Sequence, residues 1–204
     1  MTLPEEAQKR ILELEQQVNG LQQQLAIAKK NAVTDPLTGI FNRRVLEKEL
    51  NFNLADTDRS YFDLVVVEID LDHFKEVNDL YGHPQGDTIL KEFTKLVQQT
   101  LRDTDIFGRW GGEEFLLILP IPHHTPVAEI EKFFRRLQSN IYKINRSNKP
   151  QEDHLGLTFS AGAVIVEAGR KKVDLERVLN QADSALYESK KIRNTFVLKK
   201  YIED

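Results

Sequence analysis

Two apolar segments that each adjoin a group of carboxylates constrain the fold of this chain more than any other feature. The segment at 62–69 runs into Asp-Leu-Asp at 70–72, and the segment at 116–119 follows the glycine turn Arg-Trp-Gly-Gly-Glu-Glu-Phe at 109–115. Runs of this length and composition are stable only as buried strands. The sequence therefore predicts two adjoining strand ends whose acidic side chains face one point at the edge of a sheet.

Those acidic side chains belong to Asp70, Asp72, Glu113 and Glu114. Carboxylates held close together in a poorly solvated site oppose one another's ionisation, and a hard cation removes that conflict. Mg²⁺ is usually held by one or two carboxylates together with substrate phosphates. We therefore expect Mg²⁺, with Mn²⁺ as an alternative, and a phosphate-bearing substrate. Each pair also has an ordinary alternative, in which the aspartates cap the next helix and the glutamates lie on an exposed hairpin.

The bulk composition narrows the class of protein. With 204 residues, 40% of them hydrophobic, the chain can form one domain of ordinary size and an appendage. A net charge of −4 argues against a broad surface for nucleic acid or anionic membrane, although a local basic pocket can still hold one nucleotide. The chain has no cysteine, no apolar stretch of membrane-spanning length and no secretory signal layout. We expect a cytoplasmic protein whose metal ligands are oxygens.

Residues 1–32 carry the heptad pattern of a coiled coil. Apolar side chains recur in steps of three and four at Ile11, Leu14, Val18, Leu21, Leu25, Ala28 and Ala32. β-Branched residues at a positions with leucine at d positions favour parallel two-stranded coils. We expect residues 1–32 to be a dimerising signalling helix and residues 33–204 to form the second domain. The alternative is an amphipathic helix folded back on its own domain.

After a first helix near residue 42, the pattern predicts the element order β-α-α-β-β-α-β-α-β. Helical spacing and strand-like runs occur at 42–54, 62–70, 83–101, 127–144, 155–166, 175–186 and 195–200, with a hairpin around Gly111 and Gly112. This order predicts an α+β domain with a mainly antiparallel central sheet flanked by helices, related to the ferredoxin-like plan.

Three motifs resemble the GGDEF family of diguanylate cyclases: residues 70–79 (DLDHFKEVND), 81–87 (YGHPQGD) and 111–115 (GGEEF). The likeness extends from Asp-Pro-Leu-Thr at 35–38 to the Ala-Asp-x-Ala-Leu-Tyr segment at 182–187. It implies the ferredoxin-like palm of nucleotidyl cyclases. It also implies a homodimer that condenses two GTP molecules into cyclic di-GMP and releases two pyrophosphates.

The resemblance assigns roles to the acidic residues. It implies that Asp70, Glu113 and the backbone carbonyl of Leu71 hold Mg²⁺, that Glu114 is a second metal ligand, and that Glu113 is the candidate base for the attacking 3′-hydroxyl. Lys75 would neutralise charge growing on the phosphates, as phosphoryl transfer requires. A solvated helix lysine is the alternative for Lys75.

The resemblance also implies nucleotide contacts. Asn78 and Asp87 match the guanine readers, and a carboxylate at 87 can accept hydrogen bonds from guanine N1–H and its exocyclic amine. Adenine would place a lone pair opposite that carboxylate, so we expect GTP rather than ATP. His83 matches a nucleotide-contacting position, with anchoring of its loop as the alternative. Gly111 and Gly112 would form the turn and let phosphates approach the backbone.

Two more patterns bear on regulation and on the phosphates. Arg102 and Asp105 resemble the family's Arg-x-x-Asp inhibitory motif, so we expect the cyclic product to bind there and inhibit, with a surface salt bridge as the alternative. Lys190 and Arg193 match residues that reach the terminal phosphates. The family pattern has a glycine directly before that arginine, and this chain is one residue shorter there, which leaves the geometry of both side chains open.

These residues are compatible with three functions. The intact acidic and nucleotide-contacting set favours a Mg²⁺-dependent cyclase that acts on GTP as a homodimer. The alternative is a catalytically inactive module that binds GTP or cyclic di-GMP. A coiled-coil scaffold would explain the heptads but not the carboxylates.

Overall fold

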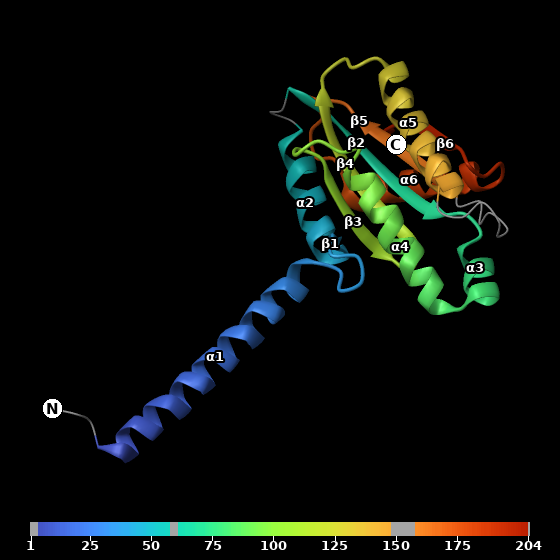
Figure 1. The fold of residues 1–204 in the computed structure, drawn as a ribbon. Helices are drawn as coiled ribbons and strands as arrows, with labels where there is room; N and C mark the ends of the chain where they lie inside the picture. The colour runs from blue at the N-terminus through green and yellow to red at the C-terminus, as the bar shows by residue number, and fades with distance from the viewer. Residues whose placement is uncertain (1–3, 58–60, 148–157, 204) are drawn as a thin grey trace.

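The computed structural model describes residues 4–57, 61–147 and 158–203, without the side chains of 142–147. A long helix leads into a domain in which helices cover both faces of one sheet (Figure 1). The elements are α1 (Glu5–Val33), β1 (Phe41–Asn42), α2 (Arg43–Asp56), β2 (Phe62–Leu71), α3 (Phe74–Tyr81), α4 (His83–Gln98), β3 (Ile106–Gly111), β4 (Glu114–Pro122), α5 (Val127–Ser147), β5 (Phe159–Val166), α6 (Leu175–Lys190) and β6 (Phe196–Lys200).

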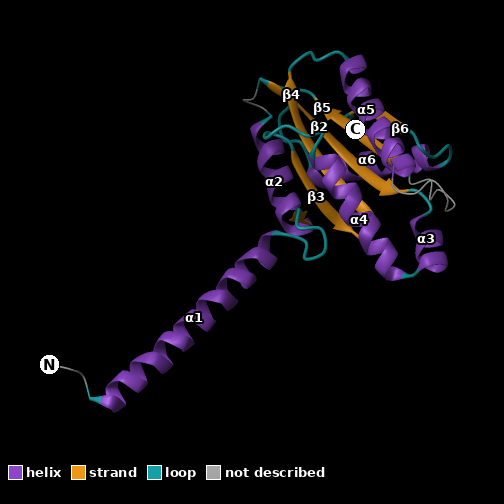
Figure 2. Cartoon of the chain, viewed as in Figure 1, coloured by secondary structure: helices purple, strands orange, loops and turns teal. Residues whose placement is uncertain are grey.

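The sheet has six strands in the order β1-β3-β4-β2-β5-β6. The three inner pairings, β3 with β4, β4 with β2 and β2 with β5, are antiparallel, whereas the outer strands β1 and β6 each pair in parallel. The predicted α+β domain with a mainly antiparallel centre is therefore confirmed, and its edges make the sheet mixed. Strand β2 lies between β4 and β5, with helices on both sides of it (Figure 2).

Side chains of β2 alternate between two hydrophobic clusters. Val65, Val67 and Ile69 pack with residues of α4 and α5, and Leu64 and Val66 pack with residues of α2 and α6. Burial on both faces explains the almost continuous apolar run of this strand. Because side chains alternate with a period of two, residues 68 and 70 share the face of Leu64 and Val66. The polar end of β2 is thereby directed to the α2 and α6 side of the sheet.

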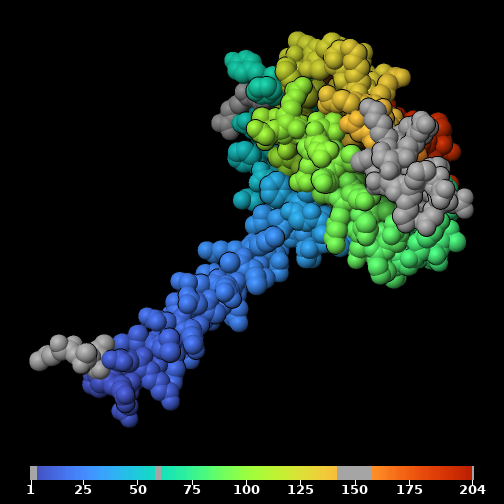
Figure 3. All heavy atoms as spheres, viewed as in Figure 1, coloured from blue at the N-terminus to red at the C-terminus, as the bar shows by residue number. Residues whose placement is uncertain are grey.

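Helix α1 projects away from the domain (Figures 1 and 3). None of its residues is buried, and the a and d side chains remain open, with Leu21 65% exposed and Leu25 55% exposed. The alternative of a helix folded back on its own domain is therefore not what the structure shows. Across the described ranges, no helix combines the length and apolarity that crossing a membrane requires.

The helices and strands expected from the sequence are present, with small differences at their ends. Asn42 caps α2, because its side chain accepts a hydrogen bond from the Val45 amide at 3.1 Å. The short strand β1 was not among the expected elements; its two residues pair in parallel with residues 108–109 of β3. The helix expected to reach residue 101 ends at Gln98. The expected start of the next strand, at 155–157, lies outside the described residues, and β5 begins at Phe159.

Candidate active site

The end of β2 and the β3–β4 hairpin bring acidic residues together. Asp70 lies directly opposite Glu114 in the antiparallel register, and the Leu71 amide donates to the Glu113 carbonyl at 3.4 Å. The turn itself consists of residues 112 and 113, since Gly111 is the last residue of β3 and pairs with Glu114. Of the two glycines, only Gly112 has a positive φ (+49°). A two-residue turn therefore holds Glu113 at the rim.

The electrostatics of this point favour a cation. Burial raises the pKa of Asp70, whose residue is 8% exposed, and the nearby carboxylates of Glu113 and Asp72 raise it further. Lys190 opposes this rise, because its Nζ donates to Asp70 Oδ2 at 2.8 Å. The pKa of Glu114 is likewise raised, first by burial and then by Asp70. Desolvated carboxylates that repel one another fit a hard cation.

No three acidic or histidine side chains in the described ranges converge tightly enough to hold a metal alone. The carboxylates available beside one another are Asp70, Glu113 and Glu114. Mg²⁺ usually takes one or two carboxylates and leaves its other positions to water and substrate phosphates. The donor set therefore fits a metal that is completed by a bound nucleotide.

Asp72 does not join this point, contrary to expectation. Its carboxylate accepts hydrogen bonds from Ser160 Oγ at 2.7 Å, Thr158 Oγ1 at 2.6 Å and the Asn194 amide at 3.0 Å. Strand β2 ends at residue 71, so strand alternation no longer sets the direction of the next side chain. Neither aspartate caps α3, whose N-cap is His73 without a side-chain capping bond. Asp72 instead ties β5 to the segment before β6.

The guanine-reader candidates lie at the junction of α3 and α4. Asn78 is half-buried on α3, and His83 and Asp87 are exposed in the first turns of α4. The backbone of Gly86 lies directly against Asn78, since a Cβ built at Gly86 would be 2.0 Å from Asn78 Oδ1. This close helix contact sets Asn78 against the residue that precedes Asp87. Lys75 lies, exposed, in the first turn of α3.

Gly86 was quoted in the motif but not assigned a role, and it provides a test of Asn78. Gly86→Ala should displace the Asn78 side chain, because a Cβ cannot lie 2.0 Å from an oxygen. We expect the KM for GTP to rise about tenfold, as for the loss of one hydrogen bond to guanine. Steady-state kinetics measure this change. Gly20→Ala is the matched control, since nothing lies within 4 Å of its Cβ position; an unchanged KM in Gly86→Ala would contradict the assignment.

The side chains of Lys190 and Arg193 contact different partners. Lys190 ends α6 and contacts Asp70, whereas Arg193 NH1 lies 2.7 Å from His73 Nε2. Arg193 and Asn194 both have positive φ, at 62° and 45°, and the Arg193 amide donates to the Ser189 carbonyl at 2.8 Å. Non-glycine residues therefore take the left-handed conformation in which helices usually end on glycine. The chain therefore turns sharply out of α6 before it enters β6.

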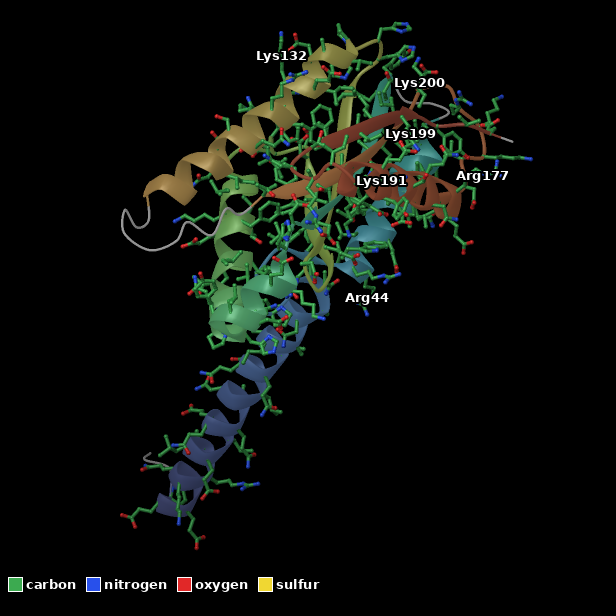
Figure 4. The ribbon with its side chains drawn as sticks, turned by 90° about the vertical axis from the view of Figure 1, so that its right-hand side faces the viewer. Arg44, Lys132, Arg177, Lys191, Lys199 and Lys200 are labelled. Atoms are coloured by element: carbon green, nitrogen blue, oxygen red, sulfur yellow. The ribbon has the colours of Figure 1, made fainter. Side chains whose placement is uncertain are left out.

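Other basic residues near α6 do not join the acidic site. Lys199 pairs with Glu188 and Lys200 pairs with Glu167, each at 2.8 Å. Figure 4 shows both lysines on the side of the domain formed by α6 and β6. Lys191 lies 4.8 Å from the centre of the Tyr187 ring. Lys190 is thus distinguished from its neighbour by its contact with Asp70.

The predicted inhibitory motif forms a compact turn between α4 and β3. The Asp105 carboxylate accepts from the Arg102 amide at 2.8 Å, and the Asp105 amide donates to the Arg102 carbonyl at 3.0 Å. Since the carboxylate is bound to the backbone of Arg102, the alternative of a salt bridge between the two side chains is not what the structure shows. The Arg102 side chain remains exposed.

Arg109 joins the glycine turn to the segment that follows α1. Its Nε donates to the Gly112 carbonyl at 2.8 Å, and its NH1 lies 3.2 Å from Asp35 Oδ1. Asp35 also accepts from the amide and the hydroxyl of Thr38, at 2.8 and 2.6 Å. Burial alone would raise the pKa of Asp35, but the hydrogen bonds from Thr38 and the charge of Arg109 outweigh it and lower this pKa.

Glu68 was missed by sequence reasoning. Burial raises its pKa to about 8, and the carboxylates of Asp183 and Glu114 contribute. It lies on β2 two residues before Asp70, on the same face of the sheet. A glutamate two residues before a strand-end aspartate, within an otherwise apolar run, was the available signal.

The raised pKa of Glu68 predicts that the folded chain loses stability as the pH rises. Its pKa is higher in the folded chain, so between pH 4.5 and about 8 the folded chain keeps a proton that the unfolded chain releases. The stabilisation is complete below pH 4.5 and is lost as the pH rises through 8. In Glu68→Gln, we expect the free energy of unfolding at pH 8.5 to exceed that of the native chain by about 2–4 kcal/mol.

Denaturant unfolding across this pH range, without Mg²⁺ or nucleotide, measures the difference. Glu92→Gln, an exposed site on α4, should leave the native pH profile unchanged. Parallel profiles for the native chain and Glu68→Gln would show that Glu68 titrates normally.

Comparison with known proteins identifies relatives with this architecture. The family model described as "Diguanylate cyclase, GGDEF domain" matches residues 32–195. The diguanylate cyclase DgcP of Pseudomonas aeruginosa is 34% identical over 183 residues, which cover 90% of this chain. The chain spans only about a quarter of the length of that protein, 26%.

Solved structures give the same result. Diguanylate cyclase SiaD of Pseudomonas aeruginosa, in complex with its activator SiaC, matches 95% of this chain and 72% of that chain at a TM-score of 0.72 and 30% identity. The GGDEF domain of DgcB from Caulobacter crescentus, in complex with c-di-GMP, matches 82% of this chain and 95% of that chain at a TM-score of 0.70 and 28% identity.

Proposed function

Because this chain belongs to the GGDEF family of diguanylate cyclases, we propose that it condenses two GTP molecules into cyclic di-GMP and releases two pyrophosphates. The observation that carries the proposal is the meeting of Asp70 with Glu114 across β2 and β4, with Glu113 in the adjoining turn and Lys190 bound to Asp70. Desolvated carboxylates beside a lysine suit a substrate that brings phosphates and a cation. We propose that the reaction takes place in the cytoplasm, where GTP is available.

In this proposal Asp70, Glu113, Glu114 and the Leu71 carbonyl hold Mg²⁺, with Mn²⁺ as an alternative. The bound metal would neutralise charge on the phosphates. Glu113 accepts the proton of the attacking 3′-hydroxyl, and its place in the turn between β3 and β4, half-buried beside the Asp70–Glu114 pair, supports this role.

The remaining residues bind and orient GTP. Lys75, Lys190 and Arg193 supply cations for the phosphates, and Gly111 and Gly112 leave the turn open, with nothing within 4 Å of either Cβ position. Asn78 and Asp87 read guanine. His83 contacts the nucleotide from the start of α4.

We propose further that the active form is a homodimer. Residues 1–32 form a coiled coil with a second copy, and residues 33–204 form the catalytic domain. The open seam of α1 supports this arrangement, since Ile11, Leu14, Val18, Leu21 and Leu25 are all at least 43% exposed in the single chain. Each domain presents one GTP, and holding the two in line gives the advantage of proximity.

Arg102 and Asp105 form the proposed inhibitory site for cyclic di-GMP. The exposed guanidinium offers a planar donor pair to phosphate or guanine. The compact turn between the two residues supports the proposal, because it fixes their spacing before any ligand binds.

The proposal is tested by incubating the native chain with GTP and Mg²⁺, measuring pyrophosphate and identifying the nucleotide product by chromatography. We expect cyclic di-GMP, no product with ATP, and no reaction in excess EDTA. If the native dimer bound GTP or cyclic di-GMP in calorimetry but released no pyrophosphate, the chain would be the catalytically inactive binding module instead.

A further inference from the structure

The contact between Arg193 and His73 joins two segments that are 120 residues apart, the end of α6 and the start of α3. We propose that His73 is a positioning residue that holds the Arg193 guanidinium at the N-terminal end of α3, where the terminal phosphates of GTP would bind. This inference rests on the proposed function and adds a residue to it. It assigns a role to an imidazole that lies between Asp72 and the helix carrying Lys75.

The hydrogen-bonding groups define how the contact works. Arg193 NH1 lies 2.7 Å from His73 Nε2, and His73 Nδ1 lies 2.7 Å from Glu76 Oε1. A guanidinium can only donate, so Nε2 accepts and the ring proton is on Nδ1, where it is donated to Glu76. Glu76 thus selects the tautomer and orients the ring. The imidazole presents a fixed acceptor to Arg193.

The backbone supports the same conclusion. His73 and Arg193 both have positive φ, at 60° and 62°, a conformation that non-glycine residues seldom adopt. The His73 carbonyl accepts the first hydrogen bond of α3, from Val77 at 3.1 Å, and Asp72 holds the Asn194 amide at 3.0 Å. Both residues of this side-chain contact, His73 and Arg193, therefore have an uncommon backbone conformation. Such outliers concentrate at functional sites.

The benefit of the contact is pre-organisation. A free arginine side chain loses much rotamer freedom when it binds a phosphate, and that loss weakens binding. Arg193 held by His73 has lost part of this freedom before GTP arrives. The effect belongs to substrate binding, so it should appear in KM and not in kcat.

His73→Asn is the primary variant, because asparagine tolerates positive φ but reaches only as far as Nδ1 of the imidazole. We expect the KM for GTP to rise about three- to tenfold, with kcat within twofold of native, as for the loss of one immobilised side chain. In an Arg193→Asn background, His73→Asn should cause no further change. His73→Gln, whose amide oxygen can reach the position of Nε2, should restore KM towards the native value.

His124→Asn is the matched control, since His124 also has positive φ, at 64°, but lies just beyond β4 at the opposite end of that strand from the glycine turn. The KM of His124→Asn for GTP should equal the native value. An unchanged KM in His73→Asn, an equal rise in the Arg193→Asn background, or an equal rise in His124→Asn would each overturn the inference.

Calorimetry of GTP binding in the presence of Mg²⁺ is run on the same variants. If the native chain released no pyrophosphate, the proposed function would fail, while GTP affinities across the four combinations of the 73 and 193 variants would still measure the coupling of the two side chains. Additive affinity losses would overturn the role of His73 in that case too.

Discussion

Glu113→Gln is expected to lower the rate of pyrophosphate release from GTP roughly a thousandfold, the scale of losing a general base and a charge at the reacting centre. Glutamine has nearly the shape of glutamate, and the Glu113 carbonyl that accepts from Leu71 belongs to the backbone, so the turn should persist. What is lost is a carboxylate that can take a proton and hold a cation. Continuous detection of pyrophosphate at saturating GTP and Mg²⁺ gives the rate.

Glu92→Gln makes the same chemical change at an exposed site on α4 and should retain the native rate. Circular dichroism of both variants checks that the fold is intact. A Glu113→Gln variant with more than about a tenth of native activity would remove Glu113 from the chemical step, because such a loss is only about 1.4 kcal/mol of barrier.

Leu21→Arg is expected to lower specific activity by more than about tenfold at sub-micromolar protein, because a charge at a d position opposes the pairing of two helices. Leu21 is 65% exposed in the single chain, and α1 has no buried residue, so the catalytic domain should not unfold. The activity lost on dilution should return at high protein concentration, where mass action restores the dimer.

Ile27→Arg is the control for this variant. Ile27 is also exposed, at 60%, but lies outside the a and d positions, so the substitution should leave both mass and activity unchanged. Sedimentation velocity gives the oligomeric state across the same dilution series. Constant specific activity of Leu21→Arg at every concentration would show that catalysis does not depend on pairing through α1.

The order of elements was predictable from the sequence because the core strands are buried on both faces. Strand β2 reads as an apolar run for that reason, and the helices that cover it show the helical period. The meeting of the end of β2 with the glycine turn was expected, whereas the register that places Asp70 opposite Glu114 comes from the structure. What could not be predicted from local pattern was the direction of Asp72, since its partners Thr158 and Ser160 belong to β5 and its approach.

Other features of the site depend on contacts between distant segments. The contact of Arg193 with His73 accompanies a left-handed backbone at Arg193 and Asn194 just after α6. The raised pKa of Glu68 depends on its enclosure near Asp183 of α6. Both arise from tertiary packing: the spacing before Asp70 marks Glu68 as a candidate, but its enclosure and its charged neighbours come from other segments.

The Arg109 side chain connects the segment after α1 to the glycine turn. Its guanidinium donates to Asp35, two residues beyond the last residue of α1. It also donates to the carbonyl of Gly112, the residue before Glu113. A twist or tilt of the helix that moves Asp35 acts on the turn through this side chain, alongside the bridge between Thr34 and Phe41. The projecting helix α1 and the turn that carries Glu113 are therefore connected through one arginine side chain.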